Sequence, residues 1–307
     1  MNEEAPHREE VRFEDRGTTL AGHLSVPALV RRHPAVVLVR GAGPSERDEG
    51  SSFLNHFVRR GIAVLSYDRP GVGGSSGDWR LQTVPYDRAQ EALAAVRFLR
   101  ESADVDAEHV GLWGISQGGW VVPLAASISE DIAFIITVSG PGVNPAEQNL
   151  YDIQMRLRAD GFGNEHVRAA VAYVAAVAEA ARTKWSYEEL YDTVLRDAEG
   201  QAWYEYSPVP DAGLWEVALH TDQDYDPEPV LERVNCPVLA IFGERDVAVP
   251  VTKSIEVYNR ALTRGGNHDF TVKVFRGADH GIKVDGEFAL GYLELMSEWI
   301  LERASAG

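Results

Sequence analysis

Short β-rich runs alternate with longer helical patterns along most of this chain of 307 residues, and this alternation limits its fold more than any other feature. Runs of β-forming residues predict eight strands, at Val11–Phe13, Leu20–Val26, Ala35–Val39, Ile62–Tyr67, Val110–Trp113, Ala133–Val138, Val238–Phe242 and Thr271–Phe275. Helical patterns predict core helices at Phe53–Arg60, Tyr86–Ser102, Gly118–Ile128, Lys253–Leu262 and Leu290–Arg303. Strands joined by crossover helices form mostly parallel sheets that are covered on both faces. The sequence therefore predicts an α/β fold with a mostly parallel, eight-stranded sheet flanked by helices.

The interval from 144 to 232 breaks this alternation. It is rich in Ala, Glu and Tyr and predicts only helices, at Gln148–Ala159, His166–Thr183 and Tyr187–Asp197. Two prolines in Asp226–Pro229 indicate a rigid return to the sheet. We therefore expect a core of residues 1–143 and 233–307, with residues 144–232 inserted between core strands as a helical cap.

An excess of acidic side chains argues against some classes of partner. The 29 basic and 47 acidic residues give a net charge of −18, whereas nucleic acids and anionic membranes require concentrated positive charge. The single cysteine, Cys236, allows neither an intrachain disulfide nor a thiolate metal cluster. The first residues lack a secretory signal, and the apolar runs are too short to span a bilayer. We expect a cytoplasmic protein without a metal, with no nucleic-acid or membrane partner; a homodimer is possible.

One serine has the surroundings of a nucleophile. Gly114-Ile-Ser116-Gln-Gly118 fits the Gly-x-Ser-x-Gly pattern, in which small residues allow a strained turn that pushes the serine Oγ out of the sheet. Ser116 lies between a predicted strand and a predicted helix, and the helix N-terminus favours negative charge nearby. A second match surrounds Ser75 but lies in a loop with no helix directly after it. We predict Ser116 as the nucleophile.

A nucleophilic serine needs an imidazole to take its proton, and His280 is our prediction for this base. It follows the last predicted strand, in the loop before the final helix. The other histidines considered are expected to be solvated, already hydrogen-bonded or misplaced for this role: His7, His23, His33, His56, His109, His166 and His220.

The imidazole in turn needs a carboxylate that fixes its tautomer. Asp246 follows the strand Val238–Phe242, and the order serine, aspartate, histidine along the chain is typical of such sheets. Glu244 in the same loop and Asp279 beside the histidine are the rival acids. We predict Asp246.

The attacked carbonyl oxygen becomes an anion and needs donors placed in advance. We predict the backbone N–H of Gln117 as one donor and that of Ala42, in the loop after Ala35–Val39, as the other, with Gly43 as the alternative. Some aromatic residues of the cap are expected to line a pocket for an apolar or aromatic substrate, while most pack the cap helices together. The residues proposed for this pocket are Arg40, Gly41, Trp120, Trp185, Tyr204 and Trp215.

Five segments carry a family resemblance: Gly41–Asp48, Tyr67–Ser75, Gly114–Trp120, Pro237–Asp246 and Gly277–His280. Through them the chain resembles the α/β-hydrolase superfamily, in particular cap-bearing bacterial esterase-like members close to the dienelactone-hydrolase and serine-aminopeptidase-type groups. Relatives usually carry His where Arg40 stands. This arginine either orders its loop through a carboxylate, meets a substrate carboxylate, or is a surface residue with no catalytic part.

The resemblance and the three side chains together predict a serine hydrolase of the carboxylesterase type. It would cleave a small-molecule ester, apolar or aromatic, through an acyl-enzyme and without a cofactor. An aminopeptidase or amidase would use the same triad and would need a cap carboxylate to hold a substrate ammonium. A non-catalytic receptor on this fold is the remaining alternative, although it has no physical need for all three side chains.

Overall fold

The computed structural model of this chain describes residues 7–28, 32–209 and 211–305. An eight-stranded sheet with the order β1-β2-β4-β3-β5-β6-β7-β8 forms its centre. The strands are β1 (His7–Asp15), β2 (Thr18–Val26), β3 (His33–Val39), β4 (Ala63–Tyr67), β5 (Val105–Ile115), β6 (Ile135–Val138), β7 (Val238–Gly243) and β8 (Phe270–Phe275). β2 pairs antiparallel with both β1 and β4, and all other neighbours pair in parallel. The predicted α/β fold with a mostly parallel, eight-stranded sheet is confirmed.

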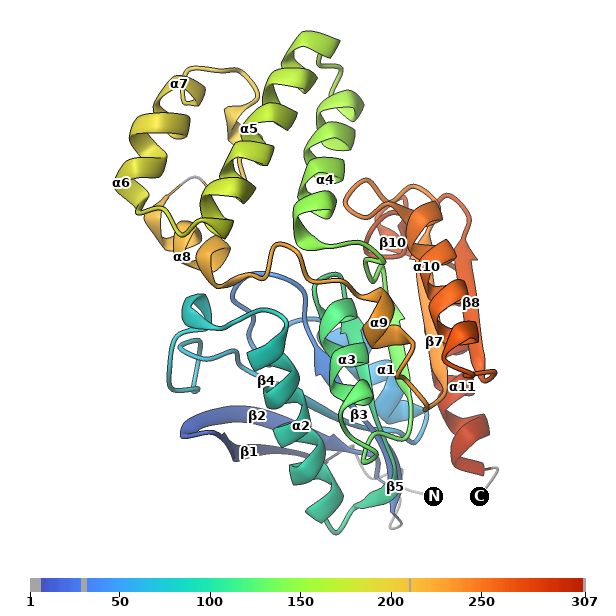
Figure 1. The fold of residues 1–307 in the computed structure, drawn as a ribbon. Helices are drawn as coiled ribbons and strands as arrows, with labels where there is room; N and C mark the ends of the chain where they lie inside the picture. The colour runs from blue at the N-terminus through green and yellow to red at the C-terminus, as the bar shows by residue number, and fades with distance from the viewer. Residues whose placement is uncertain (1–6, 29–31, 210, 306–307) are drawn as a thin grey trace.

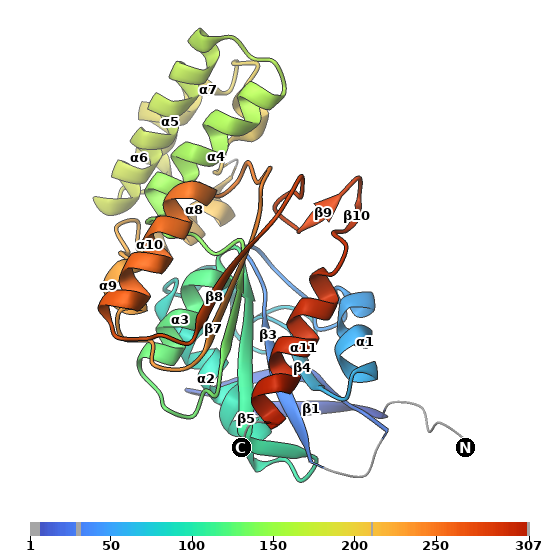
Figure 2. The ribbon, with the colours of Figure 1, turned by 90° about the vertical axis from the view of Figure 1, so that its right-hand side faces the viewer.

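Helices cover both faces of this sheet (Figure 2). One face carries α2 (Tyr86–Glu101), α3 (Gly118–Ser127), α9 (Glu228–Leu231) and α10 (Val251–Arg264), and the other carries α1 (Ser51–Arg59) and α11 (Tyr292–Ser305). Successive side chains of a strand point to opposite faces, so Val37 joins the hydrophobic cluster under α2 and α3 while Val36 joins the one under α1 and α11. A short hairpin, β9 (Lys283–Val284) and β10 (Glu287–Phe288), precedes α11.

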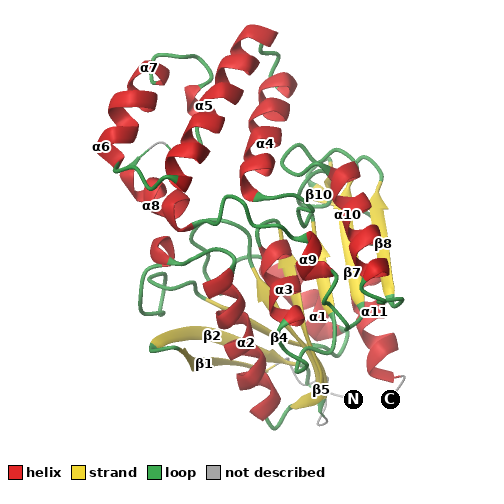
Figure 3. Ribbon diagram, in the orientation of Figure 1, coloured by secondary structure: helices red, strands yellow, loops and turns green. Residues whose placement is uncertain are grey.

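A separate group of helices rises above the carboxyl ends of the parallel strands, between β6 and β7 in the chain (Figure 1, Figure 3). It begins at Asn144, whose side chain accepts a hydrogen bond from the backbone N–H of Glu147 at 2.8 Å and so caps the first helix. Its helices pack around their own hydrophobic cluster. The elements are α4 (Pro145–Ala159), α5 (Asn164–Arg182), α6 (Tyr187–Leu190), the π-helical turn η2 (Tyr191–Leu195), α7 (Arg196–Ala198), the turn η3 (Tyr204–Tyr206) and α8 (Ala212–His220).

The segment that leads from these helices back to the sheet is hydrogen-bonded to a core loop, which follows the short turn η1 (Trp79–Leu81). Val84 donates its backbone N–H to His220 O at 2.9 Å and accepts from the backbone N–H of Asp222 at 3.0 Å. The Tyr86 hydroxyl donates to the Asp222 carboxylate at 2.9 Å. The segment between β6 and β7 is therefore hydrogen-bonded to core residues, Val84 and Tyr86, that are distant in sequence from both of these strands.

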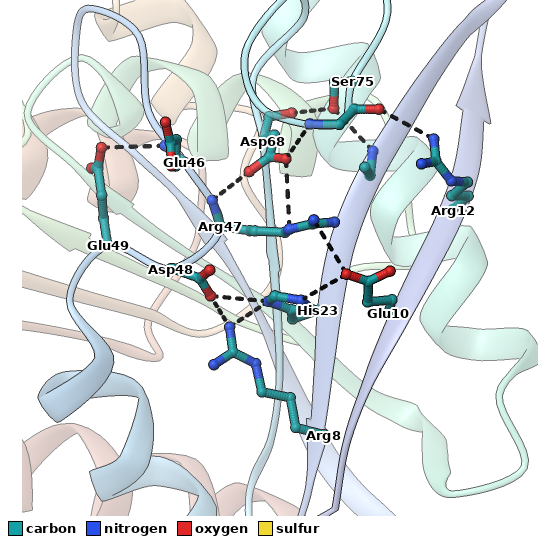
Figure 4. Close-up of polar contacts among 12 residues, drawn as sticks. Arg8, Glu10, Arg12, His23, Glu46, Arg47, Asp48, Glu49, Asp68 and Ser75 are labelled. Atoms are coloured by element: carbon teal, nitrogen blue, oxygen red, sulfur yellow. Dashed lines mark hydrogen bonds and ion pairs between the residues drawn. The ribbon is translucent and has the colours of Figure 1, made fainter.

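The loop between β3 and α1 is fastened to its surroundings by charged groups (Figure 4). Asp68, after β4, accepts a hydrogen bond from the backbone N–H of Arg47 at 2.7 Å. Asp48 contacts Arg8 of β1 and lies 3.0 Å from Nδ1 of His23 on β2. Partial burial, together with the charges of Arg8 and Arg47, lowers the pKa of His23. These contacts hold Arg47 and Asp48 of the loop against β1, β2 and the residue that follows β4.

Candidate active site

Ser116 lies on the tight turn from β5 to α3, with a φ of 53°. This left-handed conformation is strained for a residue with a side chain. Glycines make the turn possible, because a Cβ on Gly114 would lie 2.4 Å from the carbonyl of Gly118, and one on Gly118 would lie 2.5 Å from the carbonyl of Val39. Ser116 also donates its backbone N–H to Val138 O at 2.9 Å. The turn brings the serine to the carboxyl edge of the sheet, where it lines a cavity.

Ser75, the serine of the second motif, has a different environment (Figure 4). Its hydroxyl donates to the carbonyl of Asp68 at 2.8 Å and accepts from the backbone N–H of Ala21 at 2.9 Å. The side chain is buried. The hydrogen bond with Ala21 holds the loop after β4 against β2, and the one with Asp68 closes that loop on itself, so the role of Ser75 is structural.

His280 and Asp246 form a hydrogen-bonded pair, with 2.8 Å between Nδ1 and Oδ2. The Asp246 carboxylate is buried, and its Oδ1 accepts from the backbone N–H groups of Ala248 at 2.8 Å and Val249 at 3.0 Å. The Ser139 hydroxyl donates to the carbonyl of His280 at 2.8 Å and fixes the loop after β8. An imidazole held at Nδ1 by a carboxylate carries its basic lone pair on Nε2.

The two rival acids are occupied elsewhere in the same loops. Glu244 accepts from the backbone N–H of Gly277 at 2.7 Å. Asp279 accepts from the backbone N–H groups of Gly281 and Lys283, each at 2.9 Å. Of the three carboxylates weighed from the sequence, Asp246 is the one that contacts the imidazole.

The charges around His280 set its basicity. Burial of the imidazole acts to lower its pKa, but the hydrogen bond and negative charge of Asp246 outweigh this effect, and the pKa is raised. Asp152, on α4, adds to the rise. Burial raises the pKa of Asp152 itself, in part against the charge of Arg156 at 3.5 Å. No pattern in the sequence distinguishes Asp152 from the other acidic residues of this segment.

Among the described residues, no hydrogen bond joins Ser116 Oγ to the imidazole of His280. Contacts between a nucleophile and its base are often long until substrate binds. Nor does any group of three or more His, Cys, Asp or Glu side chains in the described part of the chain have the geometry to hold a metal ion.

The backbone next to Ser116 offers two donors. A Cβ on Gly41 would lie 3.4 Å from Ser116 Cβ, so this loop runs directly beside the serine. Ala42 and Gln117 line the same cavity as Ser116. Within the described ranges, neither backbone N–H, that of Ala42 or that of Gln117, donates a hydrogen bond. Both are therefore available to a developing oxyanion.

The cavity has a volume of about 260 Å³. Trp120, predicted for the pocket, lines it and donates its indole N–H to Val143 O at 3.0 Å. Apolar side chains of α5 and α8 form the far wall: Val174, Val177, Ala178, Ala181, Leu214, Val217 and Ala218. None of the described residues that line it is charged. The sequence did not reveal these residues, because small apolar side chains at helical spacing are equally typical of a core.

Three aromatic residues predicted for the pocket lie elsewhere, so that part of the prediction is wrong. Trp215 is buried in the hydrophobic cluster of the helices between β6 and β7 and donates its indole N–H to the carbonyl of Trp185 at 3.1 Å. Trp185 and Tyr204 pack against the same cluster. Their large apolar surfaces hold these helices together, and smaller residues face the cavity.

Arg40 is also not among the residues that line the cavity. Its guanidinium donates to the backbone carbonyl of Glu49, in the same loop, and packs against Gly50. Burial lowers the pKa of Arg40. Arg40 orders its loop, which is the first of the three alternatives predicted for it, but it does so through a backbone carbonyl instead of a carboxylate.

Comparison with known proteins gives a consistent result. The sequence pattern of the X-Pro dipeptidyl-peptidase (S15) family matches residues 18–280. Esterase EstD of Thermotoga maritima is 26% identical over 285 residues, which are 90% of this chain and 61% of that protein. A hypothetical protein of Pseudomonas aeruginosa, PA2218, superimposes with a TM-score of 0.68 at 20% identity, over 97% of this chain and 94% of that one. The α/β hydrolase GrgF of a Penicillium species superimposes with a TM-score of 0.60 at 21% identity, over 98% and 97% of the two chains.

Proposed function

We propose that this chain, which belongs to the X-Pro dipeptidyl-peptidase (S15) family, hydrolyses small apolar carboxylic esters through an acyl-enzyme. The family match and the esterase relative agree with the hydrolase of the α/β-hydrolase superfamily predicted from the sequence. One observation carries the proposal: the buried Asp246 holds the half-buried His280 at the same sheet edge as Ser116, a strained serine that opens on a cavity.

In the proposed reaction His280 Nε2 takes the proton of the Ser116 hydroxyl as Oγ attacks the ester carbonyl. The backbone N–H groups of Ala42 and Gln117 stabilise the oxyanion. His280 then returns the proton to the departing alcohol, and a water molecule activated in the same way releases the acid. Asp246 holds the imidazole in its reactive tautomer and stabilises the imidazolium.

The cavity indicates the kind of acyl group. Its far wall is apolar, and the polar residues that also line it, Gln148, Asn149, Thr221 and Gln223, are uncharged. A charged group would lose its hydration there without an oppositely charged partner. Its volume of about 260 Å³ lies at or below the small end of the usual range for small-molecule sites, about 300–1,000 Å³. Short, uncharged acyl groups therefore fit best.

Labelling with a fluorophosphonate tests the nucleophile directly. We expect Ser116 to be labelled in the wild-type protein and the labelling to disappear in Ser116→Ala. Ser75→Ala is the matched control, because it removes the serine of the other Gly-x-Ser-x-Gly motif and should leave labelling intact. A panel of p-nitrophenyl esters from acetate to decanoate then measures hydrolysis. Folded protein that neither labels nor hydrolyses any ester would favour a ligand-binding role and refute the proposal.

A second candidate, an aminopeptidase, is favoured by Asp152 and by the family match. Asp152 places a partly buried carboxylate of α4 within electrostatic reach of His280, where it could hold a substrate ammonium. Aminoacyl p-nitroanilides distinguish the two functions. A kcat/KM for an anilide above that for every ester, lost on Asp152→Asn, would make peptide hydrolysis the main activity.

In the described part of the chain no helix has both the length and the apolar character to cross a membrane. A cytoplasmic location, a homodimer, and the lack of nucleic-acid and membrane partners stay predictions from the sequence. We also propose residues 144–232 as one cap unit that bounds the acyl cavity, because α5 and α8 supply its far wall.

A further inference from the structure

Two buried arginines lie beneath the loop that borders the nucleophile. Arg69 follows β4 and Arg88 belongs to α2, and their side chains are almost fully removed from solvent. Arg88 donates to the carbonyl of Arg40 at 2.7 Å and to that of Gly41 at 3.1 Å. Arg69 donates to the carbonyl of Gly43 at 2.8 Å. Three of four successive backbone carbonyls are thus held by guanidinium groups.

The same Arg88 guanidinium reaches the other side of the site. It donates to the side-chain carbonyl of Gln117 at 2.6 Å. One side chain therefore contacts the backbone of the loop after β3 and the side chain of Gln117, the residue whose backbone N–H is the second proposed donor.

A buried carboxyl group completes this network. Arg69 donates to Gln82 Oε1 at 2.7 Å, and the Gln82 amide donates to Glu91. Burial lowers the pKa of Arg69 to about 9 and raises that of Glu91 to about 7, and it also lowers the pKa of Arg88. The other titratable groups that face the network are Tyr67 and Asp15. The arrangement leaves two cations opposite one carboxyl group that is itself hard to ionise.

The direction of these hydrogen bonds determines where the Ala42 donor points. A trans peptide unit is planar, so the carbonyl of Gly41 and the N–H of Ala42 point in opposite directions. Arg88 holds that carbonyl toward α2 and thereby turns the N–H away from it. A hydrogen bond to the carbonyl also polarises the peptide unit and strengthens its N–H as a donor.

Stability alone does not explain two arginines at this place. Buried charges are costly to desolvate, and well-packed apolar residues of similar volume often stabilise a protein at least as well. Here, apart from the Gln82 contact, the guanidinium hydrogen bonds go to the loop after β3 and to Gln117. Preorganised donors are what lowers the barrier to acyl transfer.

We propose that Arg88, with Arg69 as a second anchor, is a positioning residue that presets both oxyanion donors before substrate binds. The proposal rests on the ester-hydrolase function proposed above. It predicts that loss of Arg88 slows the chemical step and weakens the binding of a tetrahedral mimic, whereas binding of the ground-state ester changes little.

The test compares Arg88→Met with Arg88→Lys and with Arg97→Met. Arg97 is exposed on the same helix and makes no hydrogen bond or ion pair with the described residues, so it is the matched control. For p-nitrophenyl butyrate we expect Arg88→Met to lower kcat by about 100-fold with KM unchanged within about threefold. The inhibition constant of phenylboronic acid, which mimics the tetrahedral intermediate, should rise in parallel. Arg88→Lys keeps the charge, but its single nitrogen replaces two guanidinium nitrogens that together serve three acceptors. It should lower kcat by about tenfold.

A second measurement does not depend on activity. Hydrogen–deuterium exchange of peptides covering residues 39–45 should become faster in Arg88→Met, and in Arg88→Lys if the first variant does not fold, but not in Arg97→Met. Wild-type protein without esterase activity would refute the proposed function, and the exchange data would still decide whether Arg88 orders the loop. Unchanged exchange, a kcat within about threefold of wild type, or a loss confined to KM would overturn the positioning role.

Discussion

Replacing Asp246 by asparagine should remove nearly all activity without unfolding the protein. The Asp246 carboxylate accepts three hydrogen bonds, one from His280 and two from the backbone N–H groups of Ala248 and Val249. An asparagine of the same shape has only one acceptor atom. The two backbone donors are fixed by the loop, so the amide oxygen should stay with them and the NH₂ group should face Nδ1. The imidazole must then adopt the other tautomer, protonated at Nε2, which cannot take the proton of Ser116.

The magnitude follows from this tautomer change. We expect kcat for p-nitrophenyl butyrate to fall by about 10⁴-fold, or about 5 kcal/mol in the activation barrier. The loss of one charge-assisted hydrogen bond should lower the free energy of unfolding by no more than about 3 kcal/mol, measurable by chemical denaturation.

Two substitutions in the same loops provide the controls. Glu244→Gln and Asp279→Asn change carboxylates that accept only from loop backbone N–H groups. They should retain kcat within about threefold, because neither contacts the imidazole. A loss below tenfold in Asp246→Asn, or an equal loss in either control, would contradict the assignment of the acid.

Three further predictions concern the turn, the base and the cavity. Gly118→Ala places a Cβ 2.5 Å from the carbonyl of Val39 and should destabilise the fold by about 1–3 kcal/mol in chemical denaturation. Gly200→Ala is the control and should be neutral, because no atom lies within 4 Å of the new Cβ. Equal stabilities of the two variants would refute the crowding argument. The pKa of His280 is raised above 6.5, and only the neutral imidazole accepts a proton, so kcat/KM should fall with decreasing pH through a midpoint above 6.5. Asp152→Asn removes a negative charge that raises this pKa and should move the midpoint to lower pH. A midpoint that stays in place would remove Asp152 from the site. Ala178→Phe fills part of the cavity. It should raise KM for p-nitrophenyl hexanoate by about tenfold and leave KM for the acetate ester almost unchanged. An equal change in KM for all esters would show that the acyl group binds elsewhere.

Much of the core was predictable because its signals are local. Continuous apolar runs define the central strands, and the order of Ser116, Asp246 and His280 follows from loops at the ends of parallel strands. The helix Ala212–His220 was missed, since it is short and contains Gly213. Trp215 shows why the pocket could not be predicted: composition indicates that a tryptophan is buried, but not which side of a helix it occupies.

Arg88 was missed for a related reason. Its helix was predicted from apolar residues such as Ala89 and Ala92, and a charged residue next to them is expected to be solvated. The sign that was present is the spacing of Arg88 and Glu91, three residues apart beside that apolar stripe. Two opposite charges placed there are consistent with a buried polar network.

The attachment of the cap segment at Val84 and Tyr86 bears on how the proposed cap of this chain could be exchanged. A transplanted cap brings its own residues 220 and 222, but it meets the recipient's loop before α2, which must supply the matching backbone pairing and a hydroxyl for Asp222. Chimeras that move residues 144–232 alone lack those partners, and chimeras that also move residues 83–86 keep them. We therefore expect a cap transplanted into this chain or out of it to fold and function best when both stretches of the gene move together.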